Sequence, residues 1–149
     1  MSTYRKLKHL ESVVTNTRKF SIKSSRKAGA SFAQIEAVNL TTMKDETLYV
    51  LHNSIIATRA GNILTLDFHG WKTPTTRKYM DKALLLEGIE GWVFSSDGTQ
   101  CIRIRPNKDE VKEFCFVDGQ CRINLKTKTI NLPTYEAFMN AKNRLNKWG

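Results

Sequence analysis

The sequence has no long apolar run, no disulfide scaffold and comparatively little acid, and each shortage excludes a class of protein. No apolar stretch approaches the roughly 18 residues of a membrane span, so we expect no membrane partner. The charged N-terminus lacks the apolar region of a secretory signal. Cys101, Cys115 and Cys121 are an odd number without scaffold spacing, which indicates a reducing cytoplasm.

Motifs that carry chemistry are missing as well. No two cysteines have zinc-knuckle spacing, and there is no glycine-rich phosphate loop or nucleophile motif. His52 and His69 lie near Asp67, which would suit acid/base chemistry, but histidines beside turns are more often structural. The cysteines with His69 offer four metal ligands, although buried thiols acting as small hydrophobic groups are the simpler interpretation. We therefore expect a non-enzymatic protein without a metal or a cofactor.

What the chain does have is positive charge. Its 149 residues contain 24 Lys and Arg against 14 Asp and Glu, a net charge of +10, which favours polyanionic partners. Residues 1–28 hold eight of the basic residues and one acid, Glu11. Residues 2–15 have a short amphipathic pattern, and Thr17–Ala30 is basic and serine-rich. We predict a basic N-terminal helix or flexible arm over 1–30, with a solvated tail as the alternative.

The stretch from Gly61 to Gly88 predicts a strand, a corner and a capped helix. Residues 63–69 alternate between apolar and polar side chains, as in a half-buried strand, and Gly70 interrupts them. Thr73 and Pro74 are typical of an N-cap and first helical position, and Gly88 of a C-terminal cap. The pattern thus predicts a central helix over about 74–87.

The remaining pattern predicts one α+β domain over 31–149, an antiparallel sheet with helices on one side. The segment 31–40 fits a capped helix or a strand, and we favour the strand. Asp97-Gly98 predicts a hairpin between 92–95 and 100–105. Strands over 111–117 and 122–126 are predicted to pair, and Pro133 is predicted to open a C-terminal helix over about 134–147.

The strands suggest a basic face. Alternation places Arg103 and Arg105 on one side of one strand, and Arg122, Lys126 and Lys128 on one side of another. If the two strands are neighbours, these cations form one stripe that follows a phosphate backbone, and nearby aromatic rings stack on unpaired bases. The alternative is an ordinary solvated sheet face over a core of aromatics.

The candidate nucleic-acid-binding residues therefore fall into four sets. They are the strand stripe Arg103, Arg105, Arg122, Lys126 and Lys128; the arm residues Arg18, Lys19, Lys23, Arg26 and Lys27; the helix-start residues Arg77 and Lys78; and, for base stacking, Trp71, Trp92 and Phe114. At the helix start, free amides and two cations suit a phosphate, although simple capping explains the same residues.

Two segments, 51–57 (LHNSIIA) and 70–77 (GWKTPTTR), resemble a widespread group of small tailed-phage proteins. Those proteins carry a strand ending in Ile-Ala and then Gly-Trp-x-Thr-x-Thr-Thr before a helix, and the similarity covers about residues 32–120. The resemblance implies a phage origin and a compact β-rich domain, without a known activity. In size and charge the chain is also similar to single-stranded-DNA-binding early transcription regulators of N4-related phages.

We therefore expect a DNA-binding protein, for single strands above all, acting in early transcription or replication in the cytoplasm of an infected host cell. No helix-turn-helix, zinc-finger or RNP pattern is present, which argues against sequence-specific reading of duplex DNA. Host or phage RNA polymerase is a candidate partner, and a homo-oligomer is left open. The alternative is a phage protein that binds and inhibits or redirects a host protein, steered by its charge.

Overall fold

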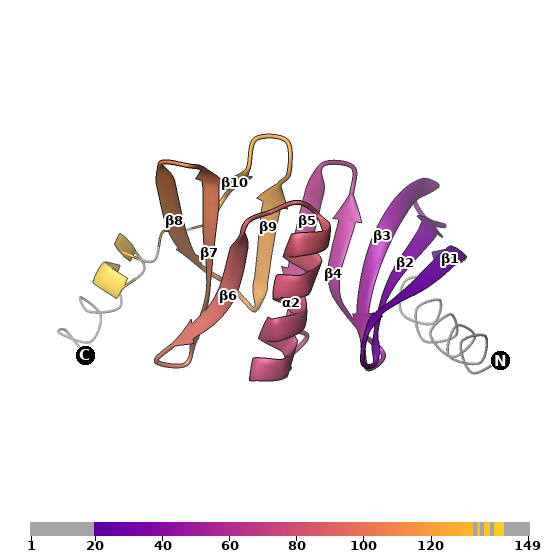
Figure 1. The fold of residues 1–149 in the computed structure, drawn as a ribbon, viewed down its shortest axis with the longest axis horizontal. Coiled ribbons are helices and arrows are strands. Elements are labelled where there is room, and N and C mark those ends of the chain that lie inside the picture. Colours follow the sequence, from indigo (N-terminus) through magenta and orange to yellow (C-terminus); the bar gives the residue numbers. More distant parts are fainter. Residues whose placement is uncertain (1–19, 133, 135, 138, 142–149) are drawn as a thin grey trace.

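The computed structural model describes residues 20–132, 134, 136, 137 and 139–141, and these form a mainly β, α+β fold (Figure 1). The elements are β1 (Phe20–Gly29), β2 (Phe32–Asn39), β3 (Lys44–Leu51), β4 (Ser54–Ala60), β5 (Ile63–Asp67), α2 (Pro74–Leu86), β6 (Gly91–Ser96), β7 (Thr99–Asn107), β8 (Glu110–Cys115), β9 (Gln120–Asn124) and β10 (Thr129–Ile130).

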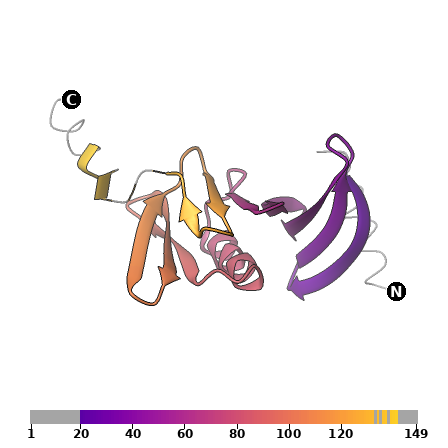
Figure 2. The same cartoon turned by 90° about the horizontal axis from the view of Figure 1, so that it is seen from above.

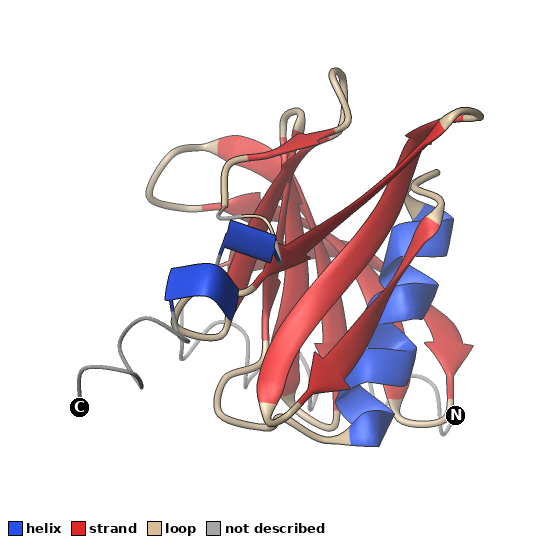
Figure 3. Ribbon diagram, turned by 90° about the vertical axis from the view of Figure 1, so that its left-hand side faces the viewer, coloured by secondary structure: helices blue, strands red, loops and turns tan. Residues whose placement is uncertain are grey.

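The strands form two antiparallel sheets. The large sheet has seven strands in the order β1-β2-β3-β4-β5-β9-β10, and the small sheet has three in the order β6-β7-β8. Figure 2 shows α2 end-on, between the small sheet and the β1–β3 end of the large sheet. In Figure 3 the same helix runs along one side of the strands. No helix among the described residues is both long and apolar enough to cross a bilayer.

The central helix is confirmed. Thr73 precedes it with an extended backbone, and its Oγ1 accepts a hydrogen bond from the backbone N–H of Thr76 at 3.2 Å. Gly88 follows the helix at φ 77°, the left-handed conformation that glycine adopts without strain. Met80 and Leu84 are fully buried and hold the helix against the sheets.

Two other local predictions are confirmed. Asp97 and Gly98 have φ of 49° and 80°, as a two-residue hairpin turn between β6 and β7 requires. The ambiguous segment 31–40 is the strand β2, in which Ile35 and Ala37 are buried.

Two apolar clusters stabilise the fold. The central core lies between the sheets and α2, and includes Leu64, Leu84, Ile102 and Ile123. A second cluster lies on the other face of β1–β4, and its buried members all come from those strands: Phe20, Ala33, Ile35, Ala37, Leu48, Val50 and Ile55. β3 is therefore buried on both faces, whereas β2 is buried along the face of the second cluster and only partly buried along most of the other.

The prediction of a flexible arm is wrong for residues 20–29, which form the edge strand β1. Phe20 and Ile22 anchor β1 in the second cluster, and its backbone pairs with β2 from Phe20↔Asn39 to Gly29↔Phe32. An edge strand tolerates the lysines and serines that made this segment look disordered, because one side of it remains solvated. The predicted helix over 2–15 lies outside the described residues.

The predicted pairing of 122–126 with 111–117 is also wrong. β9 pairs with β5, with Arg122 opposite Thr65, and with the short strand β10, whereas β8 pairs with β7. Near the C-terminus, the described residues 136, 137 and 139–141 are helical, in agreement with the start of the helix predicted over 134–147. The rest of that helix lies beyond the described residues.

Candidate nucleic-acid interface

The predicted basic stripe is divided between the two sheets. Ile102 and Ile104 on β7 and Ile123 on β9 all enter the central core, so the two strands meet through their apolar faces. The alternate side chains, Arg103 on β7 and Arg122 on β9, therefore point away from the core on opposite sides. The prediction of one shared stripe is therefore wrong. Alternation places both sets of cations outward, but on opposite sides of the central core.

The arginines of β7 have acidic partners. Arg103 Nη2 lies 3.0 Å from Glu113 Oε1 on β8, its cross-strand neighbour. Its guanidinium carbon is also 5.0 Å from the centre of the Trp92 ring and 5.4 Å from that of Phe94. Arg105 Nε lies 3.8 Å from Glu90 Oε1. The charge of this strand is thus largely balanced within the small sheet.

The cations of β9 and the turn after it differ in this respect. Arg122, Lys126 and Lys128 are exposed or partly exposed, and none of them makes an ion pair within the described part of the chain. Asn124 Oδ1 fixes the turn by accepting from the backbone N–H groups of Lys126 at 3.0 Å and Thr127 at 3.1 Å. We call Arg122, Lys126 and Lys128 the β9–β10 cations.

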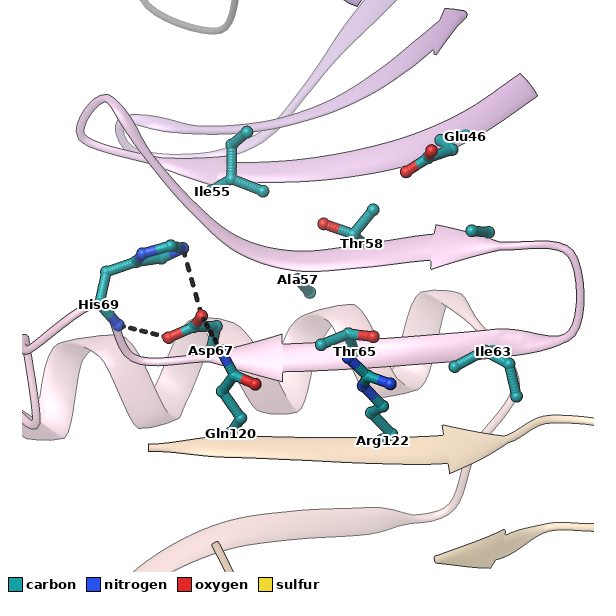
Figure 4. Close-up of a pocket in the computed structure, with 11 residues that line it drawn as sticks. Glu46, Ile55, Ala57, Thr58, Ile63, Thr65, Asp67, His69, Gln120 and Arg122 are labelled. Atoms are coloured by element: carbon teal, nitrogen blue, oxygen red, sulfur yellow. Dashed lines mark hydrogen bonds and ion pairs between the residues drawn. The ribbon is translucent and has the colours of Figure 1, made fainter. Parts of the chain in front are cut away.

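A polar pocket of about 200 Å³ lies beside Arg122 on the outer face of the large sheet (Figure 4). Thr65 of β5 lies directly opposite Arg122 in the strand register and lines the same pocket. Thr58 on β4 lies opposite Thr65 in the strand register, on the side of β5 away from Arg122. The pocket is lined by Glu46, Ile55, Ala57, Thr58, Ala60, Ile63, Thr65, Asp67, His69, Gln120 and Arg122.

The two acids of this pocket are both hydrogen-bonded. Asp67 accepts from the backbone N–H of His69 at 2.8 Å and from Gln120 Nε2 at 3.0 Å, and His69 Nε2 is 3.7 Å away (Figure 4). Glu46 accepts from Asn39 Nδ2 at 2.7 Å. These contacts leave the Arg122 guanidinium as the charged group in the pocket without a protein partner in the described chain.

A larger cleft of about 540 Å³ separates β8 from β10. Lys112 and Lys128 line it from opposite sides, together with Glu113 and Glu136. Phe114 also lines the cleft, but it is 7% exposed and belongs to the central core. Phe114 is therefore a core residue, and its ring face is not free to stack on a base.

The two predicted stacking tryptophans are accessible. Trp71 is 62% exposed in the loop between β5 and α2, and Trp92 is 41% exposed on the outer face of the small sheet. Trp92 carries Arg103 over its ring, which gives the small sheet a planar surface of aromatic and guanidinium groups.

The remaining predicted residues are dispersed. Arg77 Nη1 donates to Gln100 Oε1 at 2.9 Å, and Lys78 Nζ is 5.5 Å from the centre of the Tyr79 ring. On β1, Lys23 pairs with Asp45 at 3.3 Å, Arg26 donates to Gln34, and Lys27 makes no ion pair with the described residues. Arg18 and Lys19 lie outside the described residues.

Sequence reasoning missed the groups that surround Arg122. Asp67 and His69 gave a local signal because they are two residues apart in the sequence, although β5 ends at Asp67 and His69 lies in the turn after it. Thr65 and Gln120 gave none, since their places beside Arg122 and Asp67 depend on the pairing of β5 with β9, far apart in the sequence. Among the described residues, no three or more His, Cys, Asp or Glu side chains lie together as a metal site.

Comparisons with family models, with curated proteins and with solved structures gave no match to this chain. The resemblance to the tailed-phage group therefore stays a prediction.

Proposed function

We propose that the protein is a non-enzymatic nucleic-acid-binding protein that prefers single-stranded DNA and contacts its backbone through the β9–β10 cations. The observation that carries the proposal is the contrast in pairing, since Arg122, Lys126 and Lys128 have no acidic partner in the described chain. Cations that are already neutralised gain little from a phosphate, whereas an unpaired cation that binds a phosphate displaces the counterions condensed on the nucleic acid.

The preference for single strands rests on the shape of the elements. α2 is packed by Met80, Ala83 and Leu84 into the central core, where it is poorly placed to enter a major groove. Trp71, which is 62% exposed in the loop after β5, offers a ring for an unpaired base. In this role, and given the phage resemblance, the protein acts in early transcription or replication in the cytoplasm of an infected cell.

The test is a fluorescence titration of labelled single-stranded and duplex DNA of random sequence at several salt concentrations. We expect tighter binding to the single strand. Replacing Arg122, Lys126 and Lys128 together with Ala should lower its affinity roughly 100-fold at about 0.1 M salt. The slope of log K against log salt should become shallower by about 2, because each lost phosphate contact contributes about 0.7.

The matched control replaces Lys72, Lys82 and Lys108 with Ala, which removes the same charge from exposed positions elsewhere. If both triple variants lose affinity equally, binding follows net charge alone and the β9–β10 cations are not the site. Tighter binding of the parent protein to random duplex would contradict the preference for single strands.

A second candidate function is favoured by adjacent exposed apolar side chains at the end of α2. Leu85 is 73% exposed and the next residue, Leu86, is 36% exposed, so the two form a contiguous apolar patch that suits contact with another protein. In this alternative the protein binds and inhibits or redirects a host protein. A Leu85→Glu variant that retains single-strand binding but loses a purified candidate partner, such as RNA polymerase, would support it.

A further inference from the structure

Two of the cysteines form a cross-strand pair. Cys101 on β7 lies directly opposite Cys115 on β8, and their Sγ atoms are 3.7 Å apart. Their sequence neighbours Ile102 and Phe114 enter the central core, so the two thiols lie on the other face of the small sheet. Both are free and fully buried.

The geometry of this pair suits a disulfide. Residues directly opposite in an antiparallel pair have Cα atoms about 4.5–5.5 Å apart, within the 4.4–6.8 Å range of disulfides. An S–S bond is about 2.05 Å long, so the sulfur atoms need to approach by about 1.7 Å. Rotation about the two Cα–Cβ bonds provides this approach without a change in strand register.

We propose that Cys101 and Cys115 are a redox modification site, which a peroxide or a small disulfide converts to an intramolecular disulfide and a thiol reductant restores. With peroxide, one thiolate attacks the O–O bond and becomes a sulfenic acid as hydroxide leaves, and this hydroxide takes up the proton that the thiol released, giving water. The second thiol then attacks that sulfur and releases a second water. With oxidised glutathione, two exchange steps release two reduced glutathiones. The inference is independent of the proposed DNA binding.

The fold also sets how fast this reaction runs. Burial raises the pKa of Cys101 to about 12 and also raises that of Cys115, so the thiolate is scarce while the sheet is closed. β8 is an edge strand of a three-stranded sheet, and its local opening gives an oxidant access. Oxidation should therefore be slow at neutral pH. As the pH is raised, the rate should increase about tenfold per pH unit until the pH reaches the pKa of the thiol in the locally opened sheet.

Closing the pair stabilises the small sheet. The bond links residues 14 apart in sequence, a short loop that contains the whole β7–β8 turn. Restricting this loop in the unfolded chain should raise the melting temperature by roughly 6–12 °C. Arg103 and Glu113 lie two positions along the same ladder, where they form the next pair on the face that carries the two thiols.

Cys121 is an internal control. It lies on β9 in the large sheet and is buried in the central core, and it has no cysteine opposite it in the strand register. An oxidant that acts only on the proposed pair leaves Cys121 as a free thiol.

The experiment treats the full folded chain with hydrogen peroxide or oxidised glutathione, blocks remaining thiols under denaturing conditions, and maps peptides by mass spectrometry. We expect a Cys101–Cys115 linkage, a mass lower by about 2 Da, one blocked thiol at Cys121, and full reversal by a reductant. Cys121→Ser should behave as the parent does. Cys101→Ser and Cys115→Ser should each lose the melting-temperature rise on oxidation.

Three free thiols after oxidation of the parent protein would overturn the proposal, and so would a linkage that includes Cys121. A melting temperature that falls when the Cys101–Cys115 bond forms would overturn its stabilising role. Peptide mapping of the parent protein decides the assignment even where a serine variant fails to fold.

Discussion

β7 and β9 have nearly the same pattern of side chains, and the structure gives them opposite electrostatic surroundings. On β7, Ile102 and Ile104 alternate with arginines; on β9, Cys121 and Ile123 flank Arg122; and each strand inserts these apolar side chains into the central core. On β7, the cross-strand neighbour of Arg103 is Glu113, and Glu90 approaches Arg105. On β9, the neighbour of Arg122 is Thr65.

The difference shows that alternation predicts the face of a side chain but not the charge opposite it. The neighbouring strand supplies the cross-strand partner, and this partner decides whether an arginine is used inside the protein or is available to a ligand. Glu113 thus makes Arg103 a structural arginine, whereas Thr65 leaves Arg122 as a candidate binding arginine.

Among single substitutions, the largest expected effect comes from giving β9 the surroundings of β7. Thr65→Glu places a carboxylate opposite Arg122, where the two can form a cross-strand ion pair. We expect affinity for single-stranded DNA to fall about tenfold, because one unpaired cation is neutralised and the new acid repels phosphate. The measurement is the salt-dependent fluorescence titration described above.

Thr75→Glu is the matched control for that variant. It changes net charge by the same amount at an exposed position in the first turn of α2, where an acid suits the helix dipole. Its affinity should fall about twofold at most. Equal losses in both variants would remove the distinction between β9 and the rest of the surface.

The next prediction concerns the free energy of unfolding, which should depend on Arg103 more than on Arg122. Arg103→Ala removes the ion pair with Glu113 and the contacts with Trp92 and Phe94, at a cost of about 1–2 kcal/mol in unfolding free energy. Arg122→Ala removes no ion pair within the described chain and should change stability by less than about 0.5 kcal/mol. Urea unfolding of both variants gives the comparison, and a loss at Arg122 as large as that at Arg103 would contradict it.

The smallest expected effect comes from giving β7 the surroundings of β9. Glu113→Gln keeps the shape of the side chain but removes the charge that holds Arg103. Affinity for single strands should rise about two- to threefold and the salt slope should steepen by up to about 0.7. Unchanged affinity would indicate that the small sheet does not meet the nucleic acid, which would confine the site to the β9–β10 cations.

Elements with local signals could be predicted from the sequence. The hydroxyl of Thr73, the proline after it and Gly88 specify α2 within one short segment, and Asp97-Gly98 specifies the hairpin turn. β1 was missed because its stability depends on pairing with β2 and on Phe20 in the second cluster, while its own composition is polar.

The candidate site was harder to predict, since it depends on sheet order. The individual cations of β9 and the turn after it were identified, but their neighbours were not, because β9 joins β5 across the whole α2–β8 segment. Nothing near residue 122 in the sequence indicates Thr65 as its partner. The division of the basic stripe follows from this one long-range pairing.

The burial of β3 on both faces has a consequence for how the sequence can vary. Each position from Thr47 to Leu51 is buried, with Leu48 and Val50 in the second cluster and Tyr49 and Leu51 in the central core. Thr47 is polar and is hydrogen-bonded to Glu36 and Arg59, but a polar replacement at any of the other four removes apolar contacts on one side or the other. On β9, by contrast, every second residue faces solvent. From Leu48 to Leu51 on β3, therefore, no position tolerates a polar substitution, whereas on β9 every second position does. New surface chemistry can arise on β9 without disturbing the core.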